Sequence, residues 1–135
     1  MLKHAITYTD FQPGDVLGEA VTTFDGSMTH AWRRIFGKPA GGSDTEGAER
    51  ASLAIILMMR AYCSVVTPRP PGNVHARQRF HLHGVPLPGE SIRTVVSCSG
   101  KEIKRERRYV ELRTEGSGND GRPLFTGDMT IVWAR

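Results

Sequence analysis

The sequence lacks a long apolar run, a secretory leader and a set of paired cysteines, and each absence excludes a class of protein. Two cysteines in 135 residues cannot build the dense disulfide framework of a small secreted domain. The most apolar run, 51–59, is much shorter than the ~20 residues that a helix needs to cross a bilayer. The N-terminal stretch MLKHAITYTD is too polar for a leader or an anchor. We therefore expect a cytoplasmic protein with reduced thiols and no membrane partner.

The length and charge of the chain favour one domain with a mildly basic surface. A chain of 135 residues buries about two-thirds of its unfolded surface, so we expect a single domain over 1–135. The net charge of +4 and the pI of about 9.4 favour phosphate-bearing ligands but are too small to indicate nucleic acid. Six basic and three acidic residues lie between 101 and 113, which fits either a solvated strand face or a phosphate contact.

The stretch 48–66, AERASLAIILMMRAYCSVV, predicts a long core helix. Its apolar residues fall on every side of a helical wheel in the middle turns, so we expect other elements to enclose it. Ser43 and Glu46 have the spacing of a capping box at its start. Pro68, Pro70 and Pro71 end the helix, because proline cannot continue one.

The regions on both sides of this helix are predicted to contain strands. A strand over 18–24 precedes a small helix that Thr29 can cap, and a glycine-rich loop then leads to the core helix. After the prolines the apolar period changes to two, which is typical of strands. Four strands are expected there, over 74–83, 91–97, 103–114 and 124–134, with tight turns that include 99–101. The chain is thus predicted to be α+β.

Three histidines, His75, His81 and His83, alternate with mostly apolar residues in the strand 74–83 and are expected to share one face. Acids or cysteines at ligand spacing, which would complete a metal site, are missing beside them. We therefore expect neither a bound metal nor another cofactor.

The order of strand, short helix, long apolar helix and four antiparallel strands resembles the hotdog fold, in its MaoC-like dehydratase and hydratase branch. The resemblance covers most of the chain and rests on FQPGDVLG (11–18), THAWRRIFG (29–37), the core helix, GNVHARQRFHLHGVPLPGESI (72–92) and GRPLFTGDMTIVWAR (121–135). It implies a long central helix wrapped by a curved antiparallel sheet, and a homodimer or higher hotdog oligomer whose sheets continue across a two-fold axis. It also implies a substrate that is an acyl-CoA or another acyl thioester.

The catalytic residues of that branch are absent from their usual place. The family carries an Asp and a His between the small helix and the core helix, but here the segment 37–44 reads GKPAGGSD, with Lys38 at the expected Asp and no histidine. Three other residues are therefore the catalytic candidates. His30 follows Asp25 at the family's spacing but upstream, and Asp44 and Glu49 lie at the start of the core helix, where related thioesterases place an acid. Both carboxylates also fit a simple role in offsetting the helix dipole.

Five residues are candidates for substrate binding. Gly41 and Gly42 permit a close backbone approach at the N-terminus of the core helix, where free N–H groups can polarise a thioester carbonyl. Arg79, Arg105 and Arg107 can pair with the phosphates of CoA. Three functions fit these candidates: a hydratase or dehydratase acting on an acyl-CoA, a catalytically silent subunit that binds acyl-CoA or pairs with an active partner, and an acyl-CoA thioesterase.

Overall fold

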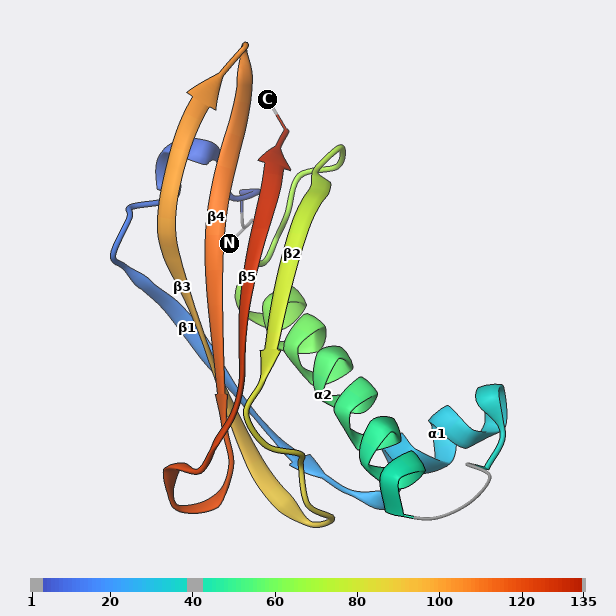
Figure 1. Ribbon diagram of the computed structural model, residues 1–135. Helices are drawn as coiled ribbons and strands as arrows, with labels where there is room; N and C mark the ends of the chain where they lie inside the picture. The colour runs from blue at the N-terminus through green and yellow to red at the C-terminus, as the bar shows by residue number, and fades with distance from the viewer. Residues whose placement is uncertain (1–3, 39–42, 135) are drawn as a thin grey trace.

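The computed structural model describes residues 4–38 and 43–134, without the side chains of 43–46. One strand and two helices precede four consecutive strands in these residues (Figure 1). In chain order the elements are β1 (Val16–Phe24), α1 (Gly26–Phe36), α2 (Ser43–Val65), β2 (Val74–Leu82), β3 (Glu90–Lys104), β4 (Arg107–Ser117) and β5 (Pro123–Trp133), with short 3-10 turns at Tyr8–Asp10 and Asn119–Gly121. Neither described helix is long and apolar enough to cross a membrane.

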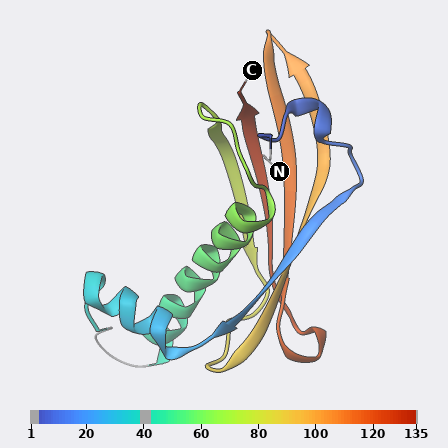
Figure 2. The same cartoon turned by 180° about the vertical axis from the view of Figure 1, so that it is seen from behind.

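The strands form one antiparallel sheet in the order β1-β3-β4-β5-β2. The sheet curves, and α2 lies across its inner face, as the two opposite views show (Figures 1 and 2). This arrangement confirms the predicted α+β architecture, in which an antiparallel sheet wraps a long central helix. β1 and β2 are the edge strands, so each has one side without a strand neighbour in the described chain.

The helix α2 is buried on one side only. Its sheet-facing residues are Leu53, Ala54, Leu57, Met58, Ala61 and Tyr62, all buried. On the opposite side Ile55 is 39% exposed, and Arg60 and Cys63 are exposed as well. The expectation that other elements enclose this helix on every side is therefore wrong for the single chain, because one curved sheet can cover only one side of a helix.

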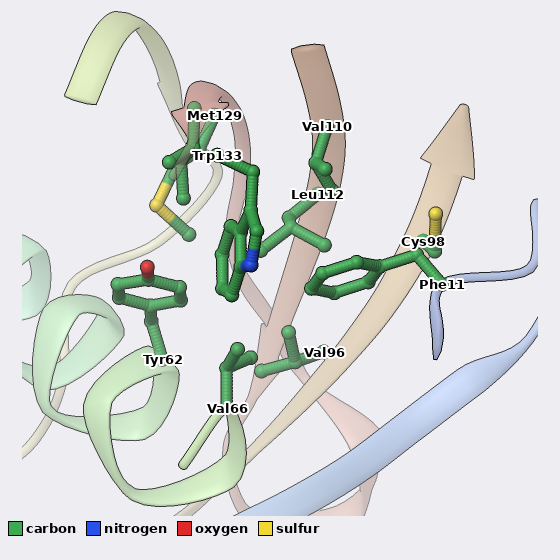
Figure 3. Packing of buried hydrophobic residues seen from close by; sticks show 10 residues of the cluster. Phe11, Tyr62, Val66, Val96, Cys98, Val110, Leu112, Met129 and Trp133 are labelled. Atoms are coloured by element: carbon green, nitrogen blue, oxygen red, sulfur yellow. The ribbon is translucent and has the colours of Figure 1, made fainter. Parts of the chain in front are cut away.

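The core consists of two clusters of buried side chains, and the one at the upper end of the sheet in Figure 1 joins the end of α2 to the N-terminal arm (Figure 3). The ring of Phe11 packs edge-on against Trp133 with centroids 4.8 Å apart. The indole N–H of Trp133 donates to the backbone oxygen of Ile6 at 2.8 Å, so the buried polar atom of the ring is satisfied. The arm thereby closes one end of the sheet.

The long hairpin of β3 and β4 differs from the prediction. A turn was expected at 99–101, but β3 runs on to Lys104 through a β-bulge between Cys98 and Gly100. The chain reverses instead at Arg105 and Glu106, which both adopt left-handed backbone with φ of 53° and 66°. Two such residues in succession match the twist of a two-residue hairpin turn. Such turns usually contain glycine, and this one has none, so the sequence did not indicate it.

A second β-bulge, in β2, places His75 on a different face of the sheet from the one predicted. The register of β2 against β5 shifts between His75 and Arg77, so His75 lies opposite the buried Ile131 while His81 lies opposite Thr126 on the outer face. His75 therefore does not share a face with His81, because a bulge inserts one residue and reverses the alternation. Among the described residues no three His, Cys, Asp or Glu side chains are grouped as a metal site would require.

Replacing Gly116 by alanine is expected to destabilise the sheet. A Cβ at Gly116 would lie 2.2 Å from Cε2 of Phe125, its cross-strand partner, whose ring is buried and stacks on Phe80. We expect Gly116→Ala to lower the free energy of unfolding by about 1–3 kcal/mol in a urea titration. Gly100→Ala is the matched control, since its Cβ would make an ordinary contact of 3.8 Å with Glu111. Equal urea midpoints for both variants would contradict this account.

Candidate active site

The second core cluster, at the lower end of the sheet in Figure 1, packs α1 against the first half of α2. Met28 is the buried residue of α1 and packs in the same cluster as Phe24, Leu53, Leu57 and Phe125. The helix begins at Gly26, and its N-cap is Asp25, which accepts from the backbone N–H of Ser27 at 2.9 Å. The prediction that Thr29 caps this helix is thus wrong. Hydrogen bonds from the hydroxyl and the backbone N–H of Ser27 lower the pKa of Asp25, as suits a capping carboxylate.

A cavity of about 490 Å³ lies between the beginnings of the two helices. It brings together His30 of α1 and Glu49 of α2, two of the three catalytic candidates. His30 lies in the second turn of α1 and Glu49 in the second turn of α2. The other lining residues are Phe24, Asp25, Gly26, Thr29, Arg33, Arg50 and Pro88.

Glu49 is held in a fork-shaped ion pair across the two helices. Nε of Arg33 donates to one carboxylate oxygen at 3.1 Å, and Nη2 donates to the other at 3.0 Å. The Glu49 side chain is 5% exposed, whereas that of Arg33 is 34% exposed and opens toward solvent. This geometry fixes the carboxylate and places a guanidinium, a strong donor to oxyanions, at the cavity wall.

His30 is the exposed histidine of the cavity, which Asp25, the N-cap of α1, also lines. It precedes Arg33 by one helical turn, so both side chains are on the same side of α1. An imidazole can take up and release a proton near neutral pH, and a water or substrate entering the cavity can reach it. The site therefore combines a proton carrier, a fixed carboxylate and a cationic donor.

No family model and no curated protein matches the sequence. Solved structures match its fold. The chain is similar to the MaoC-like dehydratase from Rhodospirillum rubrum, with a TM-score of 0.70 and 13% identity over 94% of this chain and 96% of that one. It is also similar to the unliganded R-hydratase PhaJ1 from Pseudomonas aeruginosa, with a TM-score of 0.72 and 14% identity over 97% and 87% of the two chains.

A third match, to a hot-dog-like protein from Thermanaerovibrio acidaminovorans, has a TM-score of 0.60 and 17% identity over 92% of this chain and 84% of that one. The chain has the hotdog fold. These likenesses establish the fold alone, and the chemistry depends on the residues of the cavity.

The three arginines predicted to bind substrate lie apart from this cavity. Arg79 pairs in register with Asp128 near the middle of β2, and Arg105 and Arg107 lie at the tip of the β3–β4 hairpin, at the opposite end of the sheet from α1 (Figure 1). Gly41, Gly42 and the side chain of Asp44 lie outside the described residues.

The position of Arg33 in the cavity was not predicted from the sequence. Its only signal was the spacing His30-x-x-Arg33 on an amphipathic helix, which places the two residues on one side. Nothing in the sequence indicates that Glu49, 16 residues later, would be its partner. That pairing depends on how α1 folds back against α2.

Proposed function

We propose that this hotdog protein acts on an acyl thioester such as an acyl-CoA, as a hydratase or dehydratase, in the cavity between α1 and α2. The observation that carries the proposal is the meeting of an exposed imidazole, His30, with a fixed carboxylate, Glu49, on adjacent helices. The MaoC-like dehydratase and the R-hydratase of the same fold are named for that reaction.

The roles follow from what hydration of an enoyl thioester requires. A base removes a proton from water as its oxygen bonds to the β-carbon, and a proton is then delivered to the α-carbon. His30 performs the first step and, once protonated, can perform the second. Arg33 stabilises the enolate oxygen that develops between the two steps, and Glu49 keeps its guanidinium in place.

The remaining candidate residues have supporting roles in the proposed reaction. Asp44 is a second possible base at the start of α2, and the backbone N–H groups of Gly41 and Gly42 would polarise the thioester carbonyl. Arg79, Arg105 and Arg107, which lie apart from the cavity of their own chain, would contact the phosphates of CoA from a second copy.

A catalytically silent subunit is the second candidate function. The arrangement that favours it is the bidentate pair of Arg33 and Glu49, which occupies both carboxylate oxygens. Among the described residues of the cavity, His30 is then the one proton carrier that no such pair engages. The segment 37–44 also lacks the histidine that active members of the MaoC-like branch carry. Such a chain would bind an acyl-CoA, or support an active partner, without turnover.

An assay with crotonyl-CoA separates these functions. Loss of absorbance of the conjugated thioester without thiol release is the result expected for a hydratase. Thiol release with several acyl-CoAs would indicate a thioesterase instead. Saturable binding of crotonyl-CoA in calorimetry with neither signal would identify the silent subunit and overturn the proposed catalysis.

We also propose that the protein is a homodimer built on β2 and the open side of α2. The edge of β2 has no strand neighbour in the described chain, and such an edge is a template for pairing with another strand. Beside it, α2 presents Ile55, Ile56 and Met59 with partial exposure on the side that the sheet does not cover. A second copy would cover both surfaces at once.

Light scattering of the wild type is accordingly expected to give about twice the chain mass of 14.9 kDa. Ile55→Lys should shift the protein toward the monomer, because it places a charge in the contact while disturbing little of the single chain, where Ile55 is 39% exposed. Val21→Lys on β1, the other edge strand, is the matched control at 62% exposure. A monomeric wild type at micromolar concentration would refute the dimer, and equal dissociation in both variants would place the contact elsewhere.

A further inference from the structure

A second cavity, of about 280 Å³, lies where the end of α2 meets the start of β2. It is lined by Tyr62, Arg69, Pro70, Gly72, Asn73, His75 and Ile131. Tyr62 follows Glu49 by 13 residues on α2, which corresponds to about 20 Å along the helix axis. The second cavity is therefore separate from the proposed active site.

The polar side chains of this cavity are hydrogen-bond donors, and none of its lining residues is an acid. Arg69 is fixed there, because its Nη1 donates to the backbone oxygens of Cys63 at 2.9 Å and Val66 at 2.8 Å. Its guanidinium also lies over the ring of Tyr62, 5.4 Å from the centroid. His75 reaches the same cavity because the bulge in β2 turns it to the inner face, opposite Ile131.

Asn73 supplies a donor that lacks an acceptor. Its Oδ1 accepts from the backbone N–H of Ala134 at 2.8 Å, which fixes the orientation of the amide. Its Nδ2 is then buried and finds no hydrogen-bond partner among the described residues. A buried donor without an acceptor is destabilising. Because Asn73 lines the cavity, a small shift of its side chain would let an acceptor bound there satisfy this donor.

Tyr62 adds a fourth potential donor. Figure 3 shows its hydroxyl directed away from the backbone of α2. Burial raises the pKa of this hydroxyl, and Arg69 opposes that rise only in part, so the hydroxyl keeps its proton at neutral pH. Donors from a loop, a strand and a helix thus meet at one small cavity.

We infer that the cavity formed by Arg69, Asn73, His75 and Tyr62 binds an anionic group, a phosphate or a carboxylate. Both groups present several acceptor oxygens and a negative charge, which a cationic side chain and an unpaired amide N–H complement. The inference does not depend on the proposed hydratase activity, because it concerns a different cavity and its readout is binding.

The test is a titration of the 15N-labelled wild-type protein with inorganic phosphate at constant ionic strength, with sodium chloride as the reference salt. We expect saturable NMR shifts of the Asn73 side-chain amide and of the backbone amides of Gly72 and His75. Parallel titrations with acetate and with coenzyme A identify the source of the anion. Saturation by acetate alone indicates a carboxylate ligand, and competition between coenzyme A and phosphate indicates a phosphate carried by a larger molecule.

Two variants and one control make the test specific. Asn73→Asp keeps the acceptor for Ala134 but replaces the donor by an anion, so phosphate affinity should fall at least about tenfold. His75→Gln should weaken binding about threefold, and His81→Gln, on the outer face of the same strand, should leave it unchanged. Shifts that do not saturate, that chloride reproduces, or that Asn73→Asp leaves intact would overturn the inference.

Discussion

Glu90→Gln is expected to lower the free energy of unfolding by about 3 kcal/mol and the melting temperature by about 10 °C. The Glu90 carboxylate is 1% exposed and accepts a hydrogen bond from the guanidinium of Arg122. It also accepts from the backbone N–H groups of Leu87 and Asn119, both at 2.9 Å. It thereby joins the turn before β3 to the turn between β4 and β5. An amide of the same size cannot accept all of these donors, so the variant leaves buried N–H groups unpaired.

Glu19→Gln is the matched control for this experiment. Glu19 also pairs with an arginine, Arg93, but both side chains are about half exposed, and exposed pairs contribute less than about 1 kcal/mol. Thermal unfolding of both variants by circular dichroism compares the two effects directly. Losses of equal size would mean that the Glu90 cluster does not hold the two turns together.

The same cluster is expected to make the stability of the fold depend on pH in the acid range. Burial by itself would raise the pKa of Glu90, but the hydrogen bonds from Leu87, Asn119 and Arg122 outweigh it and lower the pKa. The folded pKa therefore lies below the unfolded value of about 4.3, so the stabilisation is complete above that pH and is lost as the pH falls through the folded pKa. The melting temperature of the wild type should consequently fall more steeply below about pH 4.3 than that of Glu90→Gln.

His30→Ala is expected to lower the rate of crotonyl-CoA hydration at least about 100-fold, since a positioned acid or base contributes about 10²–10⁴ in rate. The melting temperature should remain nearly unchanged, because the His30 side chain is exposed. The measurement is kcat/KM by absorbance, beside a thermal melt of each variant. His81→Ala, which removes an exposed imidazole from the outer face of β2, should keep full activity.

The outcome separates the proton carrier from the supporting ion pair. Retention of activity in His30→Ala would remove the imidazole from the mechanism and leave the carboxylates as bases. Glu49→Gln offers the complementary test, since it weakens the hold on Arg33 and should lower both the rate and the stability. A loss of stability without any loss of rate would assign Glu49 to packing α1 on α2 alone.

The long helix and most strands could be predicted from the sequence because their signal is local. The apolar stretch 48–66 identified α2, observed over Ser43–Val65, and the period of two identified the strands of the second half. The errors in the strands fell where one or two residues change the local backbone geometry. The bulges after His75 and Cys98 insert a residue into a strand, and left-handed backbone at Arg105 and Glu106 makes a turn without glycine.

The sequence by itself determined most of the helix and strand segments, the apolar residues of the core and the candidates His30 and Glu49, because periodicity and residue chemistry act between neighbours in the chain. Only the tertiary structure decided which side chains meet. Arg33 reaches Glu49 over 16 residues and Arg122 reaches Glu90 over 32, and such pairs form when packing brings distant backbone together. The same packing leaves one side of α2 open and gathers the donors around Asn73, which no local pattern could have predicted.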